Sequence, residues 1–247
     1  MNTEHLNLSD FTKLDIRGAL RFQIMRSDSF GVTLNRSWYK LTRAFKEGDV
    51  LVVDDPWYDV LGWFTPWIIP EAKVEIPELC ELRISGASRG SLTGFQSSQD
   101  FKLLVHGASR LSGAISAGKT EIDVTGASKI ELAASVKALK LSVVGASDLK
   151  GSIKTGSADI EVFGASRIKF SGNMGDVSIK AAGGCQLDMG ELSVHDANIK
   201  LAGASRCSLN IEGKLDAELA GASRLTYGGN PIMGNIRIAG ASMLTKN

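Results

Sequence analysis

Cysteine, histidine and aromatic residues are scarce in this 247-residue chain, and it contains no long apolar run. Three cysteines cannot build the disulfide framework of a small secreted domain, and we expect no metal site from Cys80, Cys185 and Cys207. No stretch approaches the roughly 18 apolar residues of a membrane-spanning helix. With 28 basic and 27 acidic residues the net charge is +1, so nothing attracts the whole chain to nucleic acid. We therefore expect no cofactor, no metal, no nucleic-acid partner and no membrane span.

The chain is rich instead in one repeated phrase: an aliphatic residue, Gly-Ala-Ser, usually a basic residue, and another aliphatic residue. The glycines of its nine copies are Gly86, Gly107, Gly126, Gly145, Gly164, Gly183, Gly203, Gly221 and Gly240. They lie 21, 19, 19, 19, 19, 20, 18 and 19 residues apart. Self-similarity at a fixed period near 20 residues is typical of a solenoid, in which each unit buries its apolar face against its neighbours.

Apolar residues occupy every second position on both sides of each glycine. This period of two is that of a half-buried strand and not the 3.6 period of a helix. We therefore predict an all-β fold, a parallel, right-handed β-helix with coils of about 19 residues. In its core we expect four residues, each four positions before a glycine, to stack: Ile122, Leu141, Ile160 and Ile179.

Charged residues give a second indication that the coils stack in register. Five positions before successive glycines the chain has Glu81, Lys102, Glu121, Lys140 and Asp159. Stacked strands lie roughly 4.8 Å apart, so these outward side chains are neighbours, and alternating signs attract where like signs repel. Gly-Ala-Ser then fits a tight corner, because glycine adopts conformations that are costly for other residues. A column of serine hydroxyls at this corner predicts a hydrogen-bonded ladder along the solenoid.

The first 80 residues are less regular than the nine coils of residues 81–247, and we expect the two parts to form one continuous domain. The segment from Leu14 to Phe22 matches the repeat without its serine, which predicts a degenerate first coil. Residues 30–34 and 50–53 predict further strands, and the segment from Arg36 to Lys46 is interpreted as a short helix or an excursion. Residues 54–70 hold three of the four tryptophans and predict an aromatic loop.

The chain resembles the family of bacterial auto-transporter adhesins with a head GIN domain. The resemblance covers roughly residues 10–247, and three segments carry it. They are Ile76-Pro77-Glu78-Leu79, Ile84-Ser85-Gly86-Ala87-Ser88 with its later copies, and Leu225-Thr226-Tyr227-Gly228-Gly229-Asn230-Pro231. The resemblance implies a β-helix, an extracytoplasmic or cell-surface location, and adhesion. Met1 to His5 are polar and acidic, so no signal peptide is predicted in this chain, and the residues alone also allow a cytoplasmic location.

The function favoured by this pattern is a non-enzymatic, adhesion-type binding module that presents a repetitive β-helix face. The alternatives are a carbohydrate-active β-helix enzyme, either a lyase or a hydrolase, and a purely structural or oligomerising scaffold. Enzymes of that kind need converging carboxylates, whereas the acidic residues here are spread one per coil. We predict no catalytic residue. Possible partners are a second copy of the chain, which would cover the strands of the final coil, and a protein or glycan ligand.

Two features are candidate binding surfaces. The first is the aromatic loop, whose rings suit either a cap on the solenoid or contact with a ligand: Trp57, Tyr58, Trp63, Phe64 and Trp67. The second is the basic residue that follows most corner serines, at Arg89, Arg110, Lys129, Arg167, Arg206 and Arg224. Asp148, Gln186 and Met243 interrupt this column. It is interpreted as either a solvated rim or an anion-binding stripe for acidic glycans.

Overall fold

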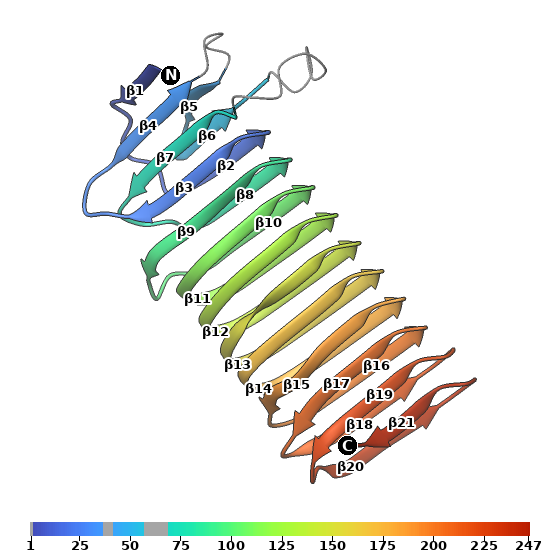
Figure 1. Ribbon diagram of the computed structural model, residues 1–247. Helices are drawn as coiled ribbons and strands as arrows, with labels where there is room; N and C mark the ends of the chain where they lie inside the picture. Colours follow the sequence, from blue (N-terminus) through green and yellow to red (C-terminus); the bar gives the residue numbers. More distant parts are fainter. Residues whose placement is uncertain (1, 37–41, 57–68) are drawn as a thin grey trace.

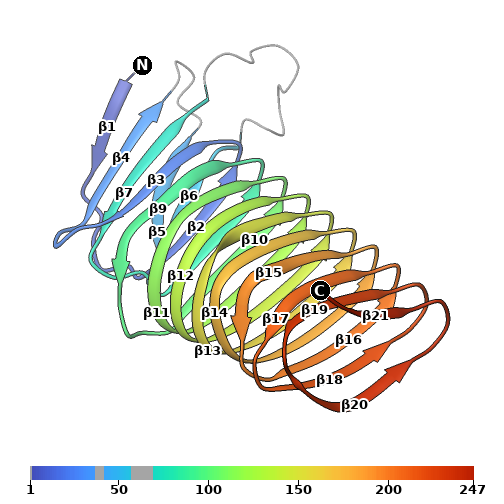
Figure 2. The ribbon, with the colours of Figure 1, turned by 60° about the horizontal axis from the view of Figure 1, so that its bottom comes forward.

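The computed structural model describes residues 2–36, 42–56 and 69–247. Within them the chain forms strands and turns without a helix, so no helix is present there that is long and apolar enough to cross a membrane. The strands wind into a long solenoid with the two chain ends at opposite ends of the stack (Figures 1 and 2). The predicted all-β solenoid is confirmed, and its right-handed sense stays a prediction.

The strands that precede the corner glycines line up in what we name the first ladder. In spatial order it contains β5 (Arg43–Glu47), β6 (Val50–Asp54), β2 (Lys13–Gly18), β8 (Glu81–Gly86), β10 (Phe101–Gly107), β11 (Arg110–Gly126), β12 (Lys129–Gly145), β13 (Asp148–Gly164), β14 (Arg167–Gly183), β16 (Ala197–Gly203), β18 (Lys214–Leu219) and β20 (Ile232–Ile238). All neighbours are parallel except β5 and β6, which are antiparallel.

The strands that follow the corners form the second ladder. In spatial order it contains β1 (Asn2–Leu6), β4 (Gly31–Arg36), β7 (Glu71–Ile76), β3 (Arg21–Arg26), β9 (Arg89–Gln96), β11, β12, β13, β14, β15 (Gln186–Val194), β17 (Arg206–Ile211), β19 (Arg224–Gly229) and β21 (Met243–Lys246). Here β1 and β4, and β4 and β7, are antiparallel. Strands β11 to β14 are 17 residues long because each continues from the second ladder into the first.

The core has the predicted register. Ile122 pairs with Leu141, Leu141 with Ile160, and Ile160 with Ile179, and none of the four is more than 5% exposed. Because side chains alternate between the two faces of a strand, a shift of one residue would have turned this whole column to solvent. The column is therefore part of a continuous apolar core that runs through both ladders.

The corner glycines have the backbone conformation that their position requires. At Gly145 the φ angle is 125°, and the other glycines of the nine copies also have positive φ. A Cβ atom on Gly145 would in addition collide with the carbonyl oxygen of Gly126 in the preceding coil. The repeat keeps glycine here because the corner has a left-handed backbone and lies directly against the coil below it.

Each corner serine ties its coil to the one before it. The Ser147 hydroxyl accepts a hydrogen bond from the Ser128 N–H (3.1 Å) and donates one to the Gly126 carbonyl (3.2 Å). The predicted ladder therefore runs between hydroxyl and backbone groups, and not from hydroxyl to hydroxyl. Ser166 makes the same two bonds one coil later. Cys185 takes the place of serine with its Sγ 3.5 Å from the Gly164 carbonyl, and a thiol is a weaker donor.

The N-terminal strands do not stack in chain order. The predicted degenerate coil is confirmed as β2 and β3, and it lies between β6 and β7 on one side and β8 and β9 on the other. Strands β4 and β6 confirm the two further predicted strands. The segment from Arg36 to Lys46 was interpreted as a short helix or an excursion. Its residues 37–41 lie outside the described residues, and residues 43–47 form β5 rather than a helix, because they pair antiparallel with β6.

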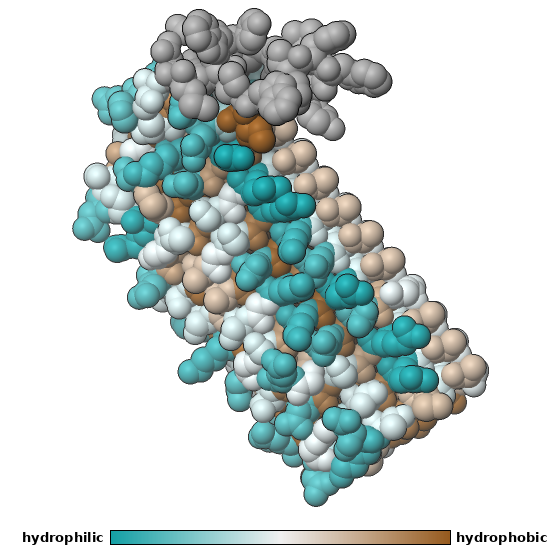
Figure 3. Space-filling view, in the orientation of Figure 1, coloured by the Kyte–Doolittle hydropathy of each residue, from teal (hydrophilic) through white to brown (hydrophobic). Residues whose placement is uncertain are grey.

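The surface residues form rows parallel to the long axis, as expected for positions that recur once per coil (Figure 3). Large apolar side chains are exposed at the last coil, where Ile232, Met233, Ile238 and Met243 are at least 44% exposed. Met233 and Ile238 continue the core columns of Leu215 and Leu219 at the open end of the stack. Farther up the stack, Val144 and Phe163 are exposed neighbours in the first ladder. The homo-oligomer suggested by the sequence stays a prediction.

Candidate functional site

The five aromatic residues proposed as a binding surface, from Trp57 to Trp67, lie outside the described residues. The residues on either side of them show where the insert joins the solenoid. The N–H of Asp55 donates to the Arg17 carbonyl (3.1 Å), and the N–H of Arg21 donates to the Pro70 carbonyl (2.9 Å). Arg17 and Arg21 flank the corner of the neighbouring coil. Residues 55–70 therefore join β6 to β7 at the place where other coils have Gly-Ala-Ser.

Asp55 is the first residue of this insert, and its side chain is held at the end of β6. Its side chain is 4% exposed and accepts a hydrogen bond from the Thr42 hydroxyl (3.0 Å). Burial raises the pKa of the Asp55 carboxyl, and the Thr42 hydrogen bond acts in the opposite direction. The hydrogen bond from Thr42 holds the end of β6 in place. Because the carboxyl group is buried, it adds no charge to the surface.

The second candidate surface, the basic column, contains a continuous run of cations. Strand pairing places Arg21 next to Arg89, Arg89 next to Arg110, and Arg110 next to Lys129. We name these four residues the cationic ladder. All four are exposed, and none makes an ion pair or a side-chain hydrogen bond with any described residue. Like charges directly opposite each other destabilise a sheet, so this arrangement costs stability.

The rest of the basic column is broken up. Lys129 is followed by Asp148, and Arg167 donates both its Nε and Nη2 hydrogens to the Gln186 Oε1 atom (3.3 and 3.2 Å). Arg206 and Arg224 are neighbours, and Met243 ends the column. Of the arginines proposed from the sequence, Arg89 and Arg110 therefore belong to the cationic ladder, while Arg167, Arg206 and Arg224 lie apart from it.

Arg21 was missed by sequence reasoning although a signal was present. It follows Gly18 by three residues, as Arg89 follows Gly86 and Arg110 follows Gly107. The degenerate coil hides this correspondence, and only the pairing of β3 with β9 places Arg21 in the column. The structure therefore extends the run of like charges from three residues to four.

In the first ladder, outward charged residues alternate in sign from coil to coil. We name its alternating residues the paired column: Glu81, Lys102, Glu121, Lys140 and Asp159. Glu121 is within 3.3 Å of the Lys102 ammonium and 3.2 Å of the Lys140 ammonium. Hydrogen bonds from Lys140 and Lys102 hold the pKa of the Glu121 carboxyl below its ordinary value, and Glu121 raises the pKa of Lys140. The alternation predicted from the sequence is thus present in the register, and at Glu121 it forms two ion pairs.

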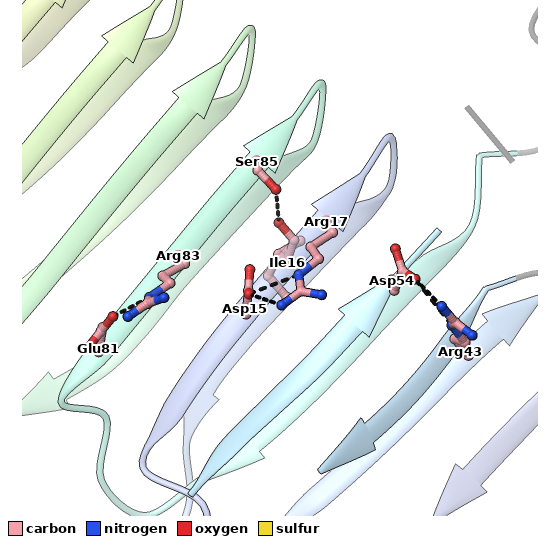
Figure 4. A network of polar contacts seen from close by, with 8 residues as sticks. All are labelled: Asp15, Ile16, Arg17, Arg43, Asp54, Glu81, Arg83 and Ser85. Carbon is pink, nitrogen blue, oxygen red and sulfur yellow. Dashed lines mark hydrogen bonds and ion pairs between the residues drawn. The ribbon is translucent and has the colours of Figure 1, made fainter. Parts of the chain in front are cut away.

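Pairing of charges extends to the N-terminal strands of the first ladder (Figure 4). The Arg17 guanidinium donates to the Asp15 Oδ2 atom from Nε (2.9 Å) and Nη2 (2.7 Å), and this hydrogen bond raises the pKa of Arg17. Arg43 is bound to Asp54 in the same way, and Arg83 pairs with Glu81. The arginines drawn in Figure 4 therefore all have a carboxylate partner, which the arginines of the cationic ladder lack.

Acidic residues flank the cationic ladder only at its ends, where Glu71 pairs with Arg21 and Asp148 with Lys129. Strands β3 and β9 and residues 110–118 contain no aspartate or glutamate. The outward neighbours of the arginines on the same strands are uncharged: Gln23, Ser91 and Ser112. Successive guanidinium groups at a strand spacing of roughly 4.8 Å, with hydroxyl and amide groups beside them, can bind a row of anionic groups. Among the described residues no group of three or more metal-ligating side chains occurs.

Comparison with known proteins gives a family and a set of structural neighbours. A family model described as "Putative auto-transporter adhesin, head GIN domain" matches residues 10–152 and 135–231. None of the curated proteins matches the chain. A "Putative lipid binding protein" from Parabacteroides distasonis is a structural neighbour with 16% identity and a TM-score of 0.73, covering 100% of this chain and 96% of that chain.

Two further neighbours are described as adhesins. A "putative adhesin" from Parabacteroides merdae is 16% identical, with a TM-score of 0.69 and coverage of 100% of this chain and 95% of the other. Another from Bacteroides fragilis is 12% identical, with a TM-score of 0.54 and coverage of 100% and 96%. At these identities the neighbours show a shared fold only. The family match, which spans most of the repeats, shows that the chain belongs to the auto-transporter adhesin head GIN domain family.

Proposed function

We propose that the chain is a non-enzymatic, extracytoplasmic adhesion-type module that binds an acidic polysaccharide of a cell surface through the cationic ladder. The observation that carries this proposal is the stack of Arg21, Arg89, Arg110 and Lys129, which makes no ion pair with a described residue although the paired column shows how this fold neutralises outward charges. An arrangement that costs stability needs another reason to be present, and a polyanionic ligand supplies the missing negative charge.

The geometry suits an extended anionic polymer better than a single small anion. The four cations lie in one row along the solenoid axis, one per coil, so their charges act on successive groups of the same chain. Arginine binds carboxylate, sulfate or phosphate groups with two parallel hydrogen bonds, which favours the three guanidinium groups over ammonium groups for this purpose. Exposed charges are screened by salt, so binding should weaken as ionic strength rises.

The neighbours and the family support this class of function. Two of the neighbours described above are called adhesins, and one is called a lipid binding protein. The headgroup phosphates of lipids are also anions, so an anionic membrane surface is the alternative outcome of the binding test. The alternative of a carbohydrate-active enzyme finds no support at the cationic ladder, because strands β3 and β9 and residues 110–118, which carry its three arginines, have no carboxylate that could act as a general acid or nucleophile there.

Charge reversal in the cationic ladder tests the proposal. We expect the protein to bind dextran sulfate and heparin at low salt, and Arg89→Glu/Arg110→Glu to lower the affinity by tenfold or more. Arg167→Glu is the matched control, because it changes the same residue type in the same column outside the ladder. Vesicles of phosphatidylcholine with and without phosphatidylglycerol form a separate arm. Unchanged polymer binding in the double variant would refute the proposal, and binding to anionic vesicles alone would replace the polysaccharide with a lipid surface.

A further inference from the structure

A groove lies across the second ladder, on the same strands as the cationic ladder but farther from the corner. It has a volume of about 340 Å³ and crosses β9, β11, β12 and β13. It leads into a second hollow of about 290 Å³, which shares Phe95, Gln96, Ile115 and Ser116 with it. The two hollows together run along the solenoid axis and have the size of ligand sites in proteins.

A column of polar side chains, one from each coil, follows the groove. Gln96 pairs with Ser116, Ser116 with Ser135, and Ser135 with Lys154, so the four are neighbours in register. No side chain of the four makes a hydrogen bond or ion pair within the described chain. Hydroxyl and amide groups both donate and accept hydrogen bonds, and the groove itself has no acidic residue and a single lysine.

The groove is open because the side chains beside this column are small. Ala114 and Ala133 are neighbours on β11 and β12, and each has only a methyl group where a longer side chain would fill the space. Phe95 lines both hollows but belongs to the core, with 8% of its surface exposed, so it forms part of their apolar floor. A shallow groove with unpartnered hydroxyl groups above an apolar floor is suited to a ligand with many hydroxyl groups and apolar C–H faces.

The direction of the groove argues against a peptide. An extended peptide is usually bound by adding a strand to the free edge of a sheet. The groove crosses strands whose backbone groups already pair with a neighbour on each side, so no edge is available. Recognition must therefore use side chains, and three of the four in the column, Gln96, Ser116 and Ser135, are uncharged hydrogen-bonding groups, with Lys154 at the end of the row. We propose that this groove binds a segment of an uncharged polysaccharide that runs along the solenoid axis. This site is separate from the cationic ladder and does not depend on it.

Binding to a panel of uncharged polysaccharides, consisting of dextran, mannan, laminarin and xyloglucan, tests the inference. We expect at least one to bind, and Ser116→Ala/Ser135→Ala to weaken it about tenfold through the loss of two hydrogen bonds. Ala133→Trp fills the groove and should abolish binding. Ser112→Ala is the matched control, because this exposed serine lies on β11 outside the groove. Thermal melting of each variant separates loss of binding from loss of folding.

The charge-reversed variant Arg89→Glu/Arg110→Glu separates this inference from the proposed function. It should bind the uncharged polymer as the wild type does while it loses dextran sulfate. If no uncharged polymer binds, or if the folded groove variants bind as well as the Ser112→Ala control, the inference is overturned even where dextran sulfate still binds. If dextran sulfate does not bind and the groove variants lose the uncharged polymer, the inference stands and the proposed function falls.

Discussion

The paired column of the first ladder and the cationic ladder of the second share the same coils and the same spacing, yet they place charge in opposite ways. In the paired column, signs alternate and ammonium groups meet carboxylates at 3.2–3.3 Å. In the cationic ladder, four positive groups lie side by side and make no ion pair with a described residue. The comparison shows that the fold can neutralise a column of outward residues when only stability matters. Repelling charges on the other ladder therefore point to a role outside the fold.

The largest effect is expected from a core residue that supports both ladders. Leu141 is 1% exposed and stacks between Ile122 and Ile160. Leu141→Ala should lower the free energy of unfolding by about 2–5 kcal/mol, because it removes buried methyl groups and leaves a cavity. At temperatures where the variant is folded, it should bind dextran sulfate with nearly unchanged affinity. Urea unfolding measures the first effect, and a loss below about 1 kcal/mol would contradict the core register.

The paired column can be made to resemble the cationic ladder. Glu121→Lys would place three lysines in succession, because Lys102 and Lys140 are its neighbours on each side. Two ion pairs are replaced by two repulsions, and we expect the melting temperature to fall by a few degrees at low salt and to recover partly at high salt. Glu121→Gln, which removes the ion pairs without adding repulsion, should lie between this variant and the wild type. Equal melting temperatures for all three would show that column charges do not affect stability.

Much of the fold was predictable because the chain repeats the same solution in coil after coil. The core column was predicted from the register of Ile122 and its equivalents, and the corners were predicted from the repeated Gly-Ala-Ser motif. The order of β6, β2 and β8 was not predictable, because it depends on pairings between irregular strands that share no repeat. The antiparallel pairings of β1, β4 and β5 were not predictable for the same reason.

The candidate site was predictable only in part. The basic column and its breaks at Asp148 and Gln186 were visible as a position after each corner serine, but the membership of Arg21, which makes a run of four cations, required the pairing of β3 with β9. The groove had no signal in the sequence, because Ala133 and Ser135 have no distinctive chemistry and become informative only as neighbours of other small or polar residues. The role of the aromatic loop stays a prediction, since Trp57 to Trp67 lie outside the described residues.

The cationic ladder can in turn be made to resemble the paired column. Arg110→Glu would place a carboxylate between Arg89 and Lys129, so that the signs alternate from Arg89 to Asp148. We expect the variant to be more stable than the wild type by roughly 0.5 kcal/mol, because repulsion is replaced by attraction between exposed groups. The same substitution should weaken binding to dextran sulfate, so stability and affinity should change in opposite directions. A variant that loses stability as well as affinity would show that the ladder contributes to the fold.

The smallest expected effect is a difference between the two columns in how their contribution to stability depends on pH. The Glu121 carboxyl has a pKa below its ordinary value of 4.5 in the folded protein, because Lys140 and Lys102 donate hydrogen bonds to it. Its stabilisation is complete above the unfolded pKa, near 4.5, and is lost as the pH falls through the lower folded pKa. Wild type should therefore be more stable than Glu121→Gln at pH 7, and urea unfolding should show this difference closing as the pH falls below that value. The corresponding difference between wild type and Arg110→Gln should stay nearly constant over the same range, because both strand neighbours of Arg110 are cations and it makes no ion pair with a described carboxylate. If the difference in free energy of unfolding between wild type and Glu121→Gln does not depend on pH, the ion pairs of Glu121 do not stabilise the fold. The two columns would then differ in their sequence of charges but not in their contribution to stability.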